Sequence, residues 1–331
     1  MTLVIGVDIG SKTAPMAWRK DGKNAGTWVI EQSATGHSLA VKKLLALKPD
    51  LIVMEATGIY YLDLAIKLTS AGLPVAVINP KSAFNFAKAM LSHSKTDKID
   101  AQLLAEYAER MTPRVWTAPT PQMLELRALG RHLNRLTGRR TQAKNELHAL
   151  KATGTTSKML IEDEEDAIVT LDKRIDRFRG AALDLILQDS ELSVSYKCMV
   201  AGPGIGEASA IAMLAELVTL PRTLKSNQVS RHAGLDVRLT QSGTSINKPG
   251  RMSKAGNAYL RSAMFMPALS ALRCDPYVKA FYEALVTRGK KKMQAIGAIM
   301  RKYLTGVWAC MRSGEAFDTA RLFSEKHLLK A

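Results

Sequence analysis

Short apolar runs alternate with helix-forming segments through the first third of the chain, and this alternation limits the folds that the chain can adopt. The runs LVIGVDIG (3–10), DLIVMEATG (50–58) and PVAVINP (74–80) have the length and the β-branched content of buried strands. Two further strands are expected near AWRK and TWVIEQ, and amphipathic segments such as SLAVKKLLAL separate the strands. Buried strands joined by helices predict a covered, partly parallel sheet, and therefore an α/β domain over residues 1–118.

Residues 119–195 follow a different period. Two runs of leucine, isoleucine and alanine recur at alternating spacings of three and four residues, on either side of the turn-rich segment GTTSK. This pattern predicts two long helices that fold back as an antiparallel coiled-coil hairpin. Such a hairpin either packs within its own chain or forms the seam of a dimer. We favour the dimer because two helices alone bury little surface.

Residues 196–331 are expected to form a mostly helical domain. The region opens with MVAGPGIGEASAIAMLAEL, in which Gly204 and Gly206 belong to a turn that leads into a helix. That turn is either the hairpin of a helix-hairpin-helix element, whose exposed N–H groups bind phosphate, or a plain helix start. A Ser/Thr/Gly loop, LTQSGTSINKPGR, comes next, followed by a helical stretch that we expect to kink or break at Pro267.

The net charge of +17 is concentrated at the C-terminal end. Residues 1–118 carry a net charge of +4, residues 119–199 carry +1 and residues 200–331 carry +12. A positive field of this size attracts polyanions. Nucleic acid is favoured over a membrane because the sequence has no basic amphipathic anchor, lipidation motif or long apolar run. The alternative is a basic surface that only keeps the protein in solution.

The cysteines and the first residues indicate a compartment. Cys198, Cys274 and Cys310 are odd in number and far apart, so they predict neither a disulfide framework nor a zinc site, and they suit a reducing environment. The opening MTLVIGVDIG lacks the basic segment of a signal peptide and meets Asp8 within its apolar run. We therefore expect a soluble, cytoplasmic protein.

Four carboxylates lie where the first domain is expected to place ligands. Asp8 lies inside the first apolar strand, and Glu55 ends the strand LIVME. Asp97 and Asp100 stand three residues apart at the start of a helical run, a spacing that points both carboxylates to one side. Each acid also has a structural interpretation: Asp8 as a turn cap, Glu55 as the start of a solvated loop, and the two aspartates as stabilisers of a helix N-terminus.

Considered together, the four acids predict a metal site. Two carboxylates about 4 Å apart repel each other by about 4 kcal/mol at an effective dielectric constant near 20, so a group of four needs a cation. Oxygen ligands without histidine or cysteine favour Mg²⁺, for which Mn²⁺ can substitute. A pair of such ions is a common means of phosphoryl transfer on nucleic acid, because the ions stabilise the entering and leaving oxygens.

The order VDIG, MEATG and KTDKIDA resembles the Asp-Glu-Asp-Asp pattern of the RuvC-like ribonuclease-H fold in transposases of insertion sequence 110 type. These transposases are relatives of the Piv invertase and of the bridge-RNA-guided recombinases. The stretches VINP, PGIGE, HAGL, QSG and RMSKAGNAYLR agree with the same family, so the similarity covers nearly the whole chain. It implies that the protein binds donor and target DNA and a bridge-type non-coding RNA. It also implies a dimer or tetramer in which the acids of one subunit complete the serine site of another.

The resemblance also implies a nucleophile. Ser242, in QSGTS, is an ordinary loop residue by sequence alone, but in similar proteins the serine of this Ser-Gly pair attacks the scissile DNA phosphate and forms a phosphoserine linkage. Such an ester conserves the phosphodiester energy for rejoining the strand elsewhere. Ser245 is the rival within the same loop. The stretch GLDV (234–237) lacks the proline that often precedes this loop in the family, which leaves the loop geometry open.

Basic and amide residues close to Ser242 are expected to contact nucleic acid. Arg251, Lys254 and Arg261 form a basic face, with Asn257 between them. Side chains of this kind position a phosphate backbone rather than read its bases. Together with the two glycines of the Gly-rich turn, they are the candidate nucleic-acid-binding residues.

Three functions are compatible with these patterns. The first is a transposase that cuts and rejoins DNA with Mg²⁺-binding acids and Ser242. The second is a metal-dependent nuclease, such as a junction resolvase, in which water attacks and no protein-linked intermediate forms. The third is an actin-like ATPase or sugar kinase, because VDIGSKT resembles the first phosphate loop of those enzymes. The sequence shows no second phosphate loop, and the basic C-terminal region favours the first function.

Overall fold

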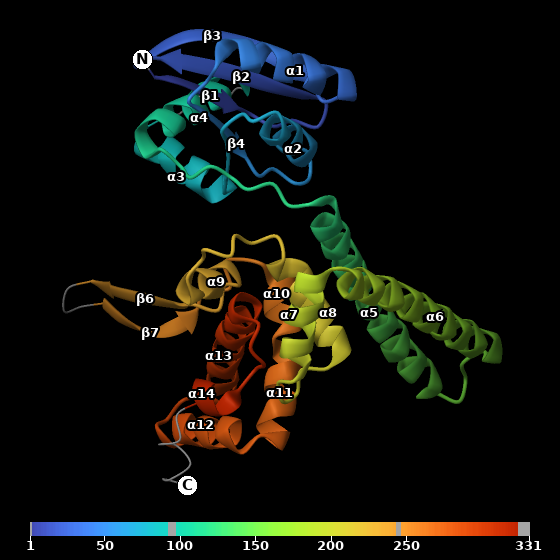
Figure 1. Cartoon of the computed structure of the whole chain (residues 1–331). Helices are drawn as coiled ribbons and strands as arrows, with labels where there is room; N and C mark the ends of the chain where they lie inside the picture. The colour runs from blue at the N-terminus through green and yellow to red at the C-terminus, as the bar shows by residue number, and fades with distance from the viewer. Residues whose placement is uncertain (1, 92–96, 243–245, 324–331) are drawn as a thin grey trace. The chain divides into compact units, whose positions relative to one another are not determined.

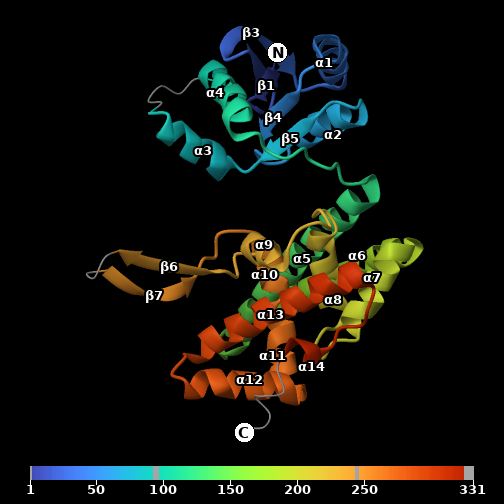
Figure 2. The ribbon, with the colours of Figure 1, turned by 60° about the vertical axis from the view of Figure 1, so that its left-hand side comes forward.

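The structure is a computed structural model that describes residues 2–91, 97–242 and 246–323. It divides into two compact units, Met1–Ala118 and Pro119–Ala331. The first unit is a sheet with helices, and the second is made of helices and one two-stranded ribbon (Figures 1 and 2). No described helix is both long enough and apolar enough to cross a membrane. The hairpin helices, which we expected to form a domain of their own, share the second unit with residues 196–331.

A mixed five-stranded sheet forms the centre of the first unit, as the alternation of strands and helices predicts. The strand order is β3-β2-β1-β4-β5. β1 pairs antiparallel with β2, and β2 with β3, whereas β1, β4 and β5 are parallel neighbours. The strands are β1 (Leu3–Val7), β2 (Thr13–Lys20), β3 (Lys23–Glu31), β4 (Leu51–Glu55) and β5 (Val75–Ile78).

Helices cover both faces of this sheet. Side chains alternate along each strand, so Ile5 and Ile52 pack on one face against α1 and α2, while Val4 and Val53 pack on the other against α3 and α4. Burial on both faces explains why the strands are almost continuously apolar. The helices are α1 (Ala34–Leu47), α2 (Leu62–Ser70), α3 (Pro80–Ala89) and α4 (Asp97–Met111).

The second unit begins with two long helices, α5 (Pro121–Lys151) and α6 (Lys158–Gln188). They pair antiparallel, because Arg140 lies 2.7 Å from Asp172 while Lys151, further along α5, lies 2.5 Å from Glu165, earlier on α6. The helical hairpin expected from the sequence is therefore present. The coiled-coil geometry and the dimer seam stay predictions.

A helical core completes the second unit around α13. Its Trp308 and Tyr303 are fully buried, and their polar atoms donate to the carbonyls of Leu224 (2.9 Å) and Pro203 (3.0 Å). These hydrogen bonds satisfy polar atoms that burial would otherwise leave without a partner. The helices are α7 (Ser190–Val200), α8 (Glu207–Leu217), α9 (Ser226–His232), α10 (Ala258–Ala263), α11 (Phe265–Cys274), α12 (Pro276–Thr287), α13 (Lys292–Ser313) and α14 (Thr319–Leu322).

The interruption expected at Pro267 lies three residues earlier, at Met264, between α10 and α11. Proline has no N–H, so Pro267 cannot donate to the carbonyl of Ala263, four residues before it. The helix therefore breaks where that hydrogen bond is missing.

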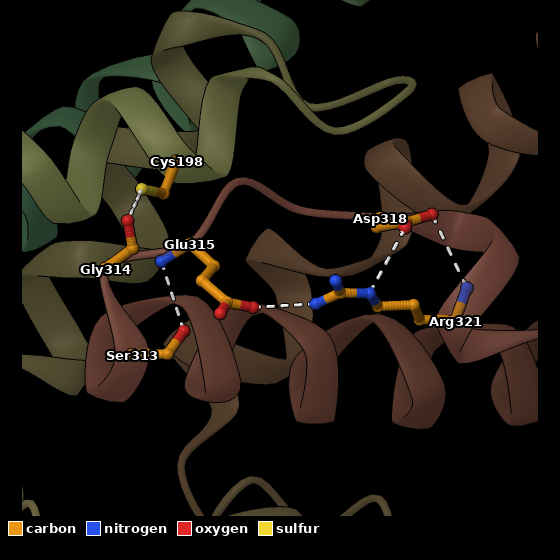
Figure 3. Close-up of polar contacts among 6 residues, drawn as sticks. All are labelled: Cys198, Ser313, Gly314, Glu315, Asp318 and Arg321. Atoms are coloured by element: carbon orange, nitrogen blue, oxygen red, sulfur yellow. Dashed lines mark hydrogen bonds and ion pairs between the residues drawn. The ribbon is translucent and has the colours of Figure 1, made fainter.

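The segment that follows α13 is fastened to α7 and to itself (Figure 3). The thiol of Cys198 donates to the carbonyl of Gly314 at 3.1 Å. Beyond this point Glu315 pairs with Arg321 at 2.7 Å, and the carboxylate of Asp318 accepts from the first N–H groups of α14. The Cys198 contact fastens the segment to α7, and the other contacts lie within the segment itself. We assign all of them a structural role.

Candidate active site

The acids Asp8 and Glu55 meet at one edge of the sheet because of strand topology. β1 and β4 are adjacent and parallel, with Val7 opposite Met54, so both strands end at the same edge. Glu55 is the last residue of β4. Asp8 directly follows β1, whereas we expected it to lie inside the strand. The carboxylates of Asp8 and Glu55 are only half buried. Carboxyl ends of parallel strands are the usual place for ligands in α/β domains.

A glycine in β1 lets α4 bring a third acid to this edge. A Cβ atom on Gly6 would lie 2.2 Å from the carbonyl oxygen of Ala101 and 2.2 Å from the backbone nitrogen of Ala105. Only glycine therefore allows the backbone of α4 to lie directly on the strand. Asp100, in the first turn of α4, is held close to the end of β1 by this contact.

Asp8, Glu55 and Asp100 line a single cavity of about 950 Å³. The hydroxyl of Thr57 also lines it and donates to Glu55 Oε1 at 3.1 Å. Residues of α3 form another part of its wall. Three acids that are 45 or more residues apart in sequence therefore line one pocket. The sequence analysis predicts that all four converge, and their role as metal ligands stays a prediction.

The fourth acid, Asp97, is the first residue of α4, and its side chain lies outside the described residues. Among the side chains that the structure describes, no three of His, Cys, Asp or Glu are grouped closely enough to hold a metal ion. The donor chemistry of the cavity fits a hard divalent cation, because carboxylate and hydroxyl oxygens line it.

A glutamine that sequence reasoning missed braces the loops behind the acids. The amide nitrogen of Gln32 donates to the carbonyl of Gly10 at 3.0 Å and to that of Tyr60 at 3.2 Å, and these carbonyls lie in the loops after Asp8 and Glu55. His37 Nε2 lies 2.7 Å from Gln32 Oε1 and fixes the amide orientation. Nothing in the local sequence around Gln32 indicates this bracing role.

Ser242 lies on a β-ribbon, which corrects the expected loop. β6 (Val237–Ser242) pairs antiparallel with β7 (Ile246–Met252), and Ser242 is the exposed last residue of β6, opposite Ile246. The β-branched residues Val237, Thr240 and Ile246 favour strands, and this signal outweighs the polar composition of the stretch. Ser245 lies outside the described residues.

Two of the predicted nucleic-acid-binding residues are open to a ligand. Arg251 is exposed on β7, and Lys254 is exposed just after the ribbon, with φ 52°. Asn257 and Arg261 are already engaged inside the protein: Asn257 donates to Glu216 Oε2 at 2.6 Å, and Arg261 donates to the carbonyl of Ala233 at 2.9 Å.

The two glycines of the Gly-rich turn differ in environment. A Cβ atom on Gly204, which has φ 76°, would lie 2.6 Å from the backbone nitrogen of Ala271 and 2.7 Å from the carbonyl oxygen of Pro267. Gly204 therefore lets the turn pack against α11. Gly206 is the exposed N-cap residue of α8.

Comparison with known proteins places the chain in a class, that of transposases. A transposase model of IS110 type matches residues 5–152, and a model of the transposase IS116/IS110/IS902 family matches residues 199–283. The chain is 31% identical over 272 residues to a pilin gene-inverting protein of Moraxella lacunata, which covers 81% of each protein. It is 25% identical to the transposase for insertion sequence element IS1111A of Coxiella burnetii, over 95% of this chain and 91% of that one.

The chain belongs to the IS116/IS110/IS902 family of transposases, and it is an enzyme of that class. The resemblance drawn from the sequence motifs is thereby confirmed. Among solved structures, RuvC of Thermus thermophilus in complex with a Holliday junction substrate aligns with a TM-score of 0.27 and 14% identity, covering 34% of this chain and 96% of that chain.

Proposed function

We propose that this transposase cuts and rejoins DNA strands with Ser242 as the nucleophile and with the acids of the first unit, those of one subunit serving the serine of another. The observation that carries the proposal is the convergence of Asp8, Glu55 and Asp100 on one open cavity. Family membership supplies the reaction class. The order and direction of the strands, with acids at the ends of β1 and β4, support a RuvC-like ribonuclease-H assignment for the first unit.

The acids would hold a divalent cation, for which we propose Mg²⁺, with Mn²⁺ as a substitute. Asp8, Glu55 and Asp100 would supply oxygen ligands from the cavity wall by moving closer together around the ion, and Asp97 is the proposed fourth. When bound, the ion supplies positive charge that stabilises the phosphate during displacement. The half-buried position of the acids keeps them within reach of a phosphate while limiting their solvation.

The proposed step is a transesterification that needs no energy donor. Ser242 Oγ forms a bond to phosphorus and loses its proton, while one P–O ester bond of the strand breaks and the departing oxygen gains a proton. In rejoining, the hydroxyl of another strand end forms the new P–O bond, and the bond between phosphorus and Ser242 Oγ breaks. The number of phosphate ester bonds is the same before and after the two steps.

The charge pattern of the ribbon supports DNA as the partner of Ser242. Arg238 pairs directly with Arg251 across the strands, an arrangement of like charges that is unfavourable unless an anion lies beside it. Arg238 lies four residues before Ser242 on β6, about 13 Å away at about 3.3 Å per residue, and the register of the ribbon shifts between Arg238 and Thr240. A phosphate backbone that followed the ribbon to Ser242 would pass both arginines.

A bridge-type non-coding RNA and a homo-oligomer, dimeric or tetrameric, are part of the same proposal. The net charge of +12 on residues 200–331 supports binding of more than one polyanion. The exposed apolar side chains of Met159, Leu160 and Val169 on α6 support a seam with a second subunit, because in isolation they contact water.

Substitution of the serine tests the proposal. With DNA that carries the element ends, Ser242→Ala is expected to abolish the covalent protein–DNA adduct seen on a denaturing gel and to leave DNA affinity unchanged. Ser245→Ala is the matched control and should keep the adduct. Because Ser242 is exposed, its loss should not alter the folding of the protein.

Two outcomes would overturn the assignment. If Ser242→Ala keeps the adduct, another residue is the nucleophile. If the wild-type protein hydrolyses DNA in Mg²⁺ without any adduct, the enzyme is a nuclease that uses water. The variant Asp100→Asn should lose both adduct and cleavage, since it removes an acid from the cavity.

A further inference from the structure

One whole face of α3 lines the cavity that Asp8, Glu55 and Asp100 also line. The α3-side lining residues recur at the spacing of a single helical stripe, which continues just beyond the end of the helix. They are Pro80, Ala83, Phe84, Ala87, Lys88 and Leu91. A helix in a globular domain normally turns such a stripe toward a packed core. Here much of the stripe faces open space instead.

Phe84 is the largest apolar side chain on this stripe, and it is 58% exposed. The ammonium of Lys88 lies 4.7 Å from the centre of its ring. Two residues along, Phe86 behaves as an ordinary core aromatic and packs edge-on against Tyr107, with ring centres 5.1 Å apart. The two rings therefore have different environments, and only Phe84 is available to a ligand.

The lining of the cavity offers two kinds of binding group to a ligand. One wall carries Asp8, Glu55 and Asp100, which suit a metal-bound phosphate. The other carries an exposed aromatic ring and a cation, which suit a flat base and a neighbouring phosphate. A nucleotide unit combines these groups, and about 950 Å³ is within the size range of ligand pockets.

We propose that Phe84 stacks an unpaired base next to the DNA phosphate that is cut, and that Lys88 binds the adjoining phosphate. The inference rests on the proposed function, because it places the scissile phosphate at the acids. A base inside a duplex has both faces covered by its neighbours, so stacking on Phe84 requires a single-stranded or locally opened site. The α3 stripe therefore makes the enzyme selective for unpaired DNA at the cut.

Single-stranded DNA with 2-aminopurine near the cut site tests the proposal with the full-length protein. Stacking on Phe84 should quench the probe in the wild type and in Phe84→Tyr, whereas Phe84→Ala and Phe84→Leu should lose the quenching. The affinity of Phe84→Ala for the single strand should fall roughly 5- to 100-fold. Leu39→Ala, which removes another exposed apolar side chain outside the cavity, should match the wild type.

The salt dependence separates the two side chains. Lys88→Gln should reduce the slope of log affinity against log salt by about 0.7, the value for one phosphate contact on a single strand, while Phe84→Ala should leave the slope unchanged. Equal quenching in Phe84→Ala and the wild type would overturn the inference. A loss of quenching in Phe84→Ala that occurs with RNA oligonucleotides but not with DNA would also overturn it.

Failure of this inference can be told apart from failure of the proposed function. If Phe84→Ala keeps the quenching and the wild type still forms the Ser242 adduct, only the stacking role is lost. If the wild type forms no adduct on any DNA, the proposed function fails first.

Discussion

At the scale of single residues, the approach of α4 to the sheet depends on the absence of one methyl group. Gly6 lies beneath α4, and a Cβ atom there would meet the backbone of Ala101 and Ala105 at 2.2 Å. Backbone atoms cannot move aside as a flexible side chain can, so the whole helix would shift. Asp100 belongs to the same helical turn as Ala101 and would move with it.

We expect Gly6→Ala to destabilise the first unit by about 1–3 kcal/mol, the range for overpacking a core, and to reduce strand cleavage by more than the loss of folded protein explains. Denaturant unfolding and a cleavage assay on the same sample give the two quantities. Gly138→Ala is the control, because nothing lies within 4 Å of its added Cβ in α5, and it should be neutral or slightly stabilising. Wild-type activity in Gly6→Ala would contradict the positioning role.

At the scale of elements, a buried carboxylate joins three helices of the second unit. Glu216 on α8 is 3% exposed and receives two hydrogen bonds from Arg131 on α5, at 2.6 and 2.9 Å, and one from Asn257 at the start of α10, at 2.6 Å. Burial alone would raise the pKa of Glu216, but the hydrogen bonds from Arg131 and Asn257 outweigh it and lower the pKa below the ordinary value of 4.5. The long hairpin is tied to the helical core at this point.

Removing the arginine should leave a buried charge without its partner. We expect Arg131→Met to lower the free energy of unfolding by about 3 kcal/mol at pH 7, near the lower end for a broken buried ion pair because Arg131 is partly exposed. Because the folded pKa of Glu216 is depressed, its stabilising contribution is complete above pH 4.5 and is lost as the pH falls further. The two proteins should therefore converge in stability in acid.

Denaturant titrations between pH 3 and 7 measure this difference. Arg222→Met is the matched control, since Arg222 pairs with Glu191 at 3.4 Å on the surface and its loss should cost less than about 1 kcal/mol. An Arg131→Met protein as stable as the control at pH 7 would show that Glu216 finds other compensation.

At the scale of the whole molecule, the two compact units have separate hydrophobic cores. One core groups residues of the sheet with α1 and α2, a second groups the sheet with α3 and α4, and the large third core draws only on residues beyond Pro119. The segment up to Trp116 belongs to the first unit, because its N–H donates to the carbonyl of Val75 at 2.7 Å. A fragment that ends at Ala118 keeps both cores of the first unit and the hydrogen bond of Trp116.

We expect the fragment 1–118 to unfold cooperatively by itself and to bind Mg²⁺. At a Mg²⁺ concentration ten times the Kd, binding should add about 1.4 kcal/mol and raise Tm by roughly 5–10 °C. Calorimetry with and without the ion measures the shift. The same fragment with Glu55→Gln and Asp100→Asn should fold but show no shift, and an equal shift in both would place the ion elsewhere.

Local patterns in the sequence were sufficient for most elements. Periods of two and of three to four residues indicated the strands, the helices and the long hairpin, because these periods report which side of an element is buried. The motifs around Asp8, Glu55 and Asp100 identified the acids. The ribbon that carries Ser242 departs from the predicted loop, because polar residues and glycine obscure a hairpin whose two strands form their hydrogen bonds mainly with each other.

The sequence by itself determined the elements, the candidate acids and the family. Only the tertiary structure decided which side chains share a cavity: that Gly6 admits α4, that Gln32 braces two distant loops, and that Phe84 lines the cavity of the acids while Phe86 packs against the core. The physical reason is that a local pattern records whether a residue is covered, whereas its neighbours depend on how elements far apart in the chain pack together.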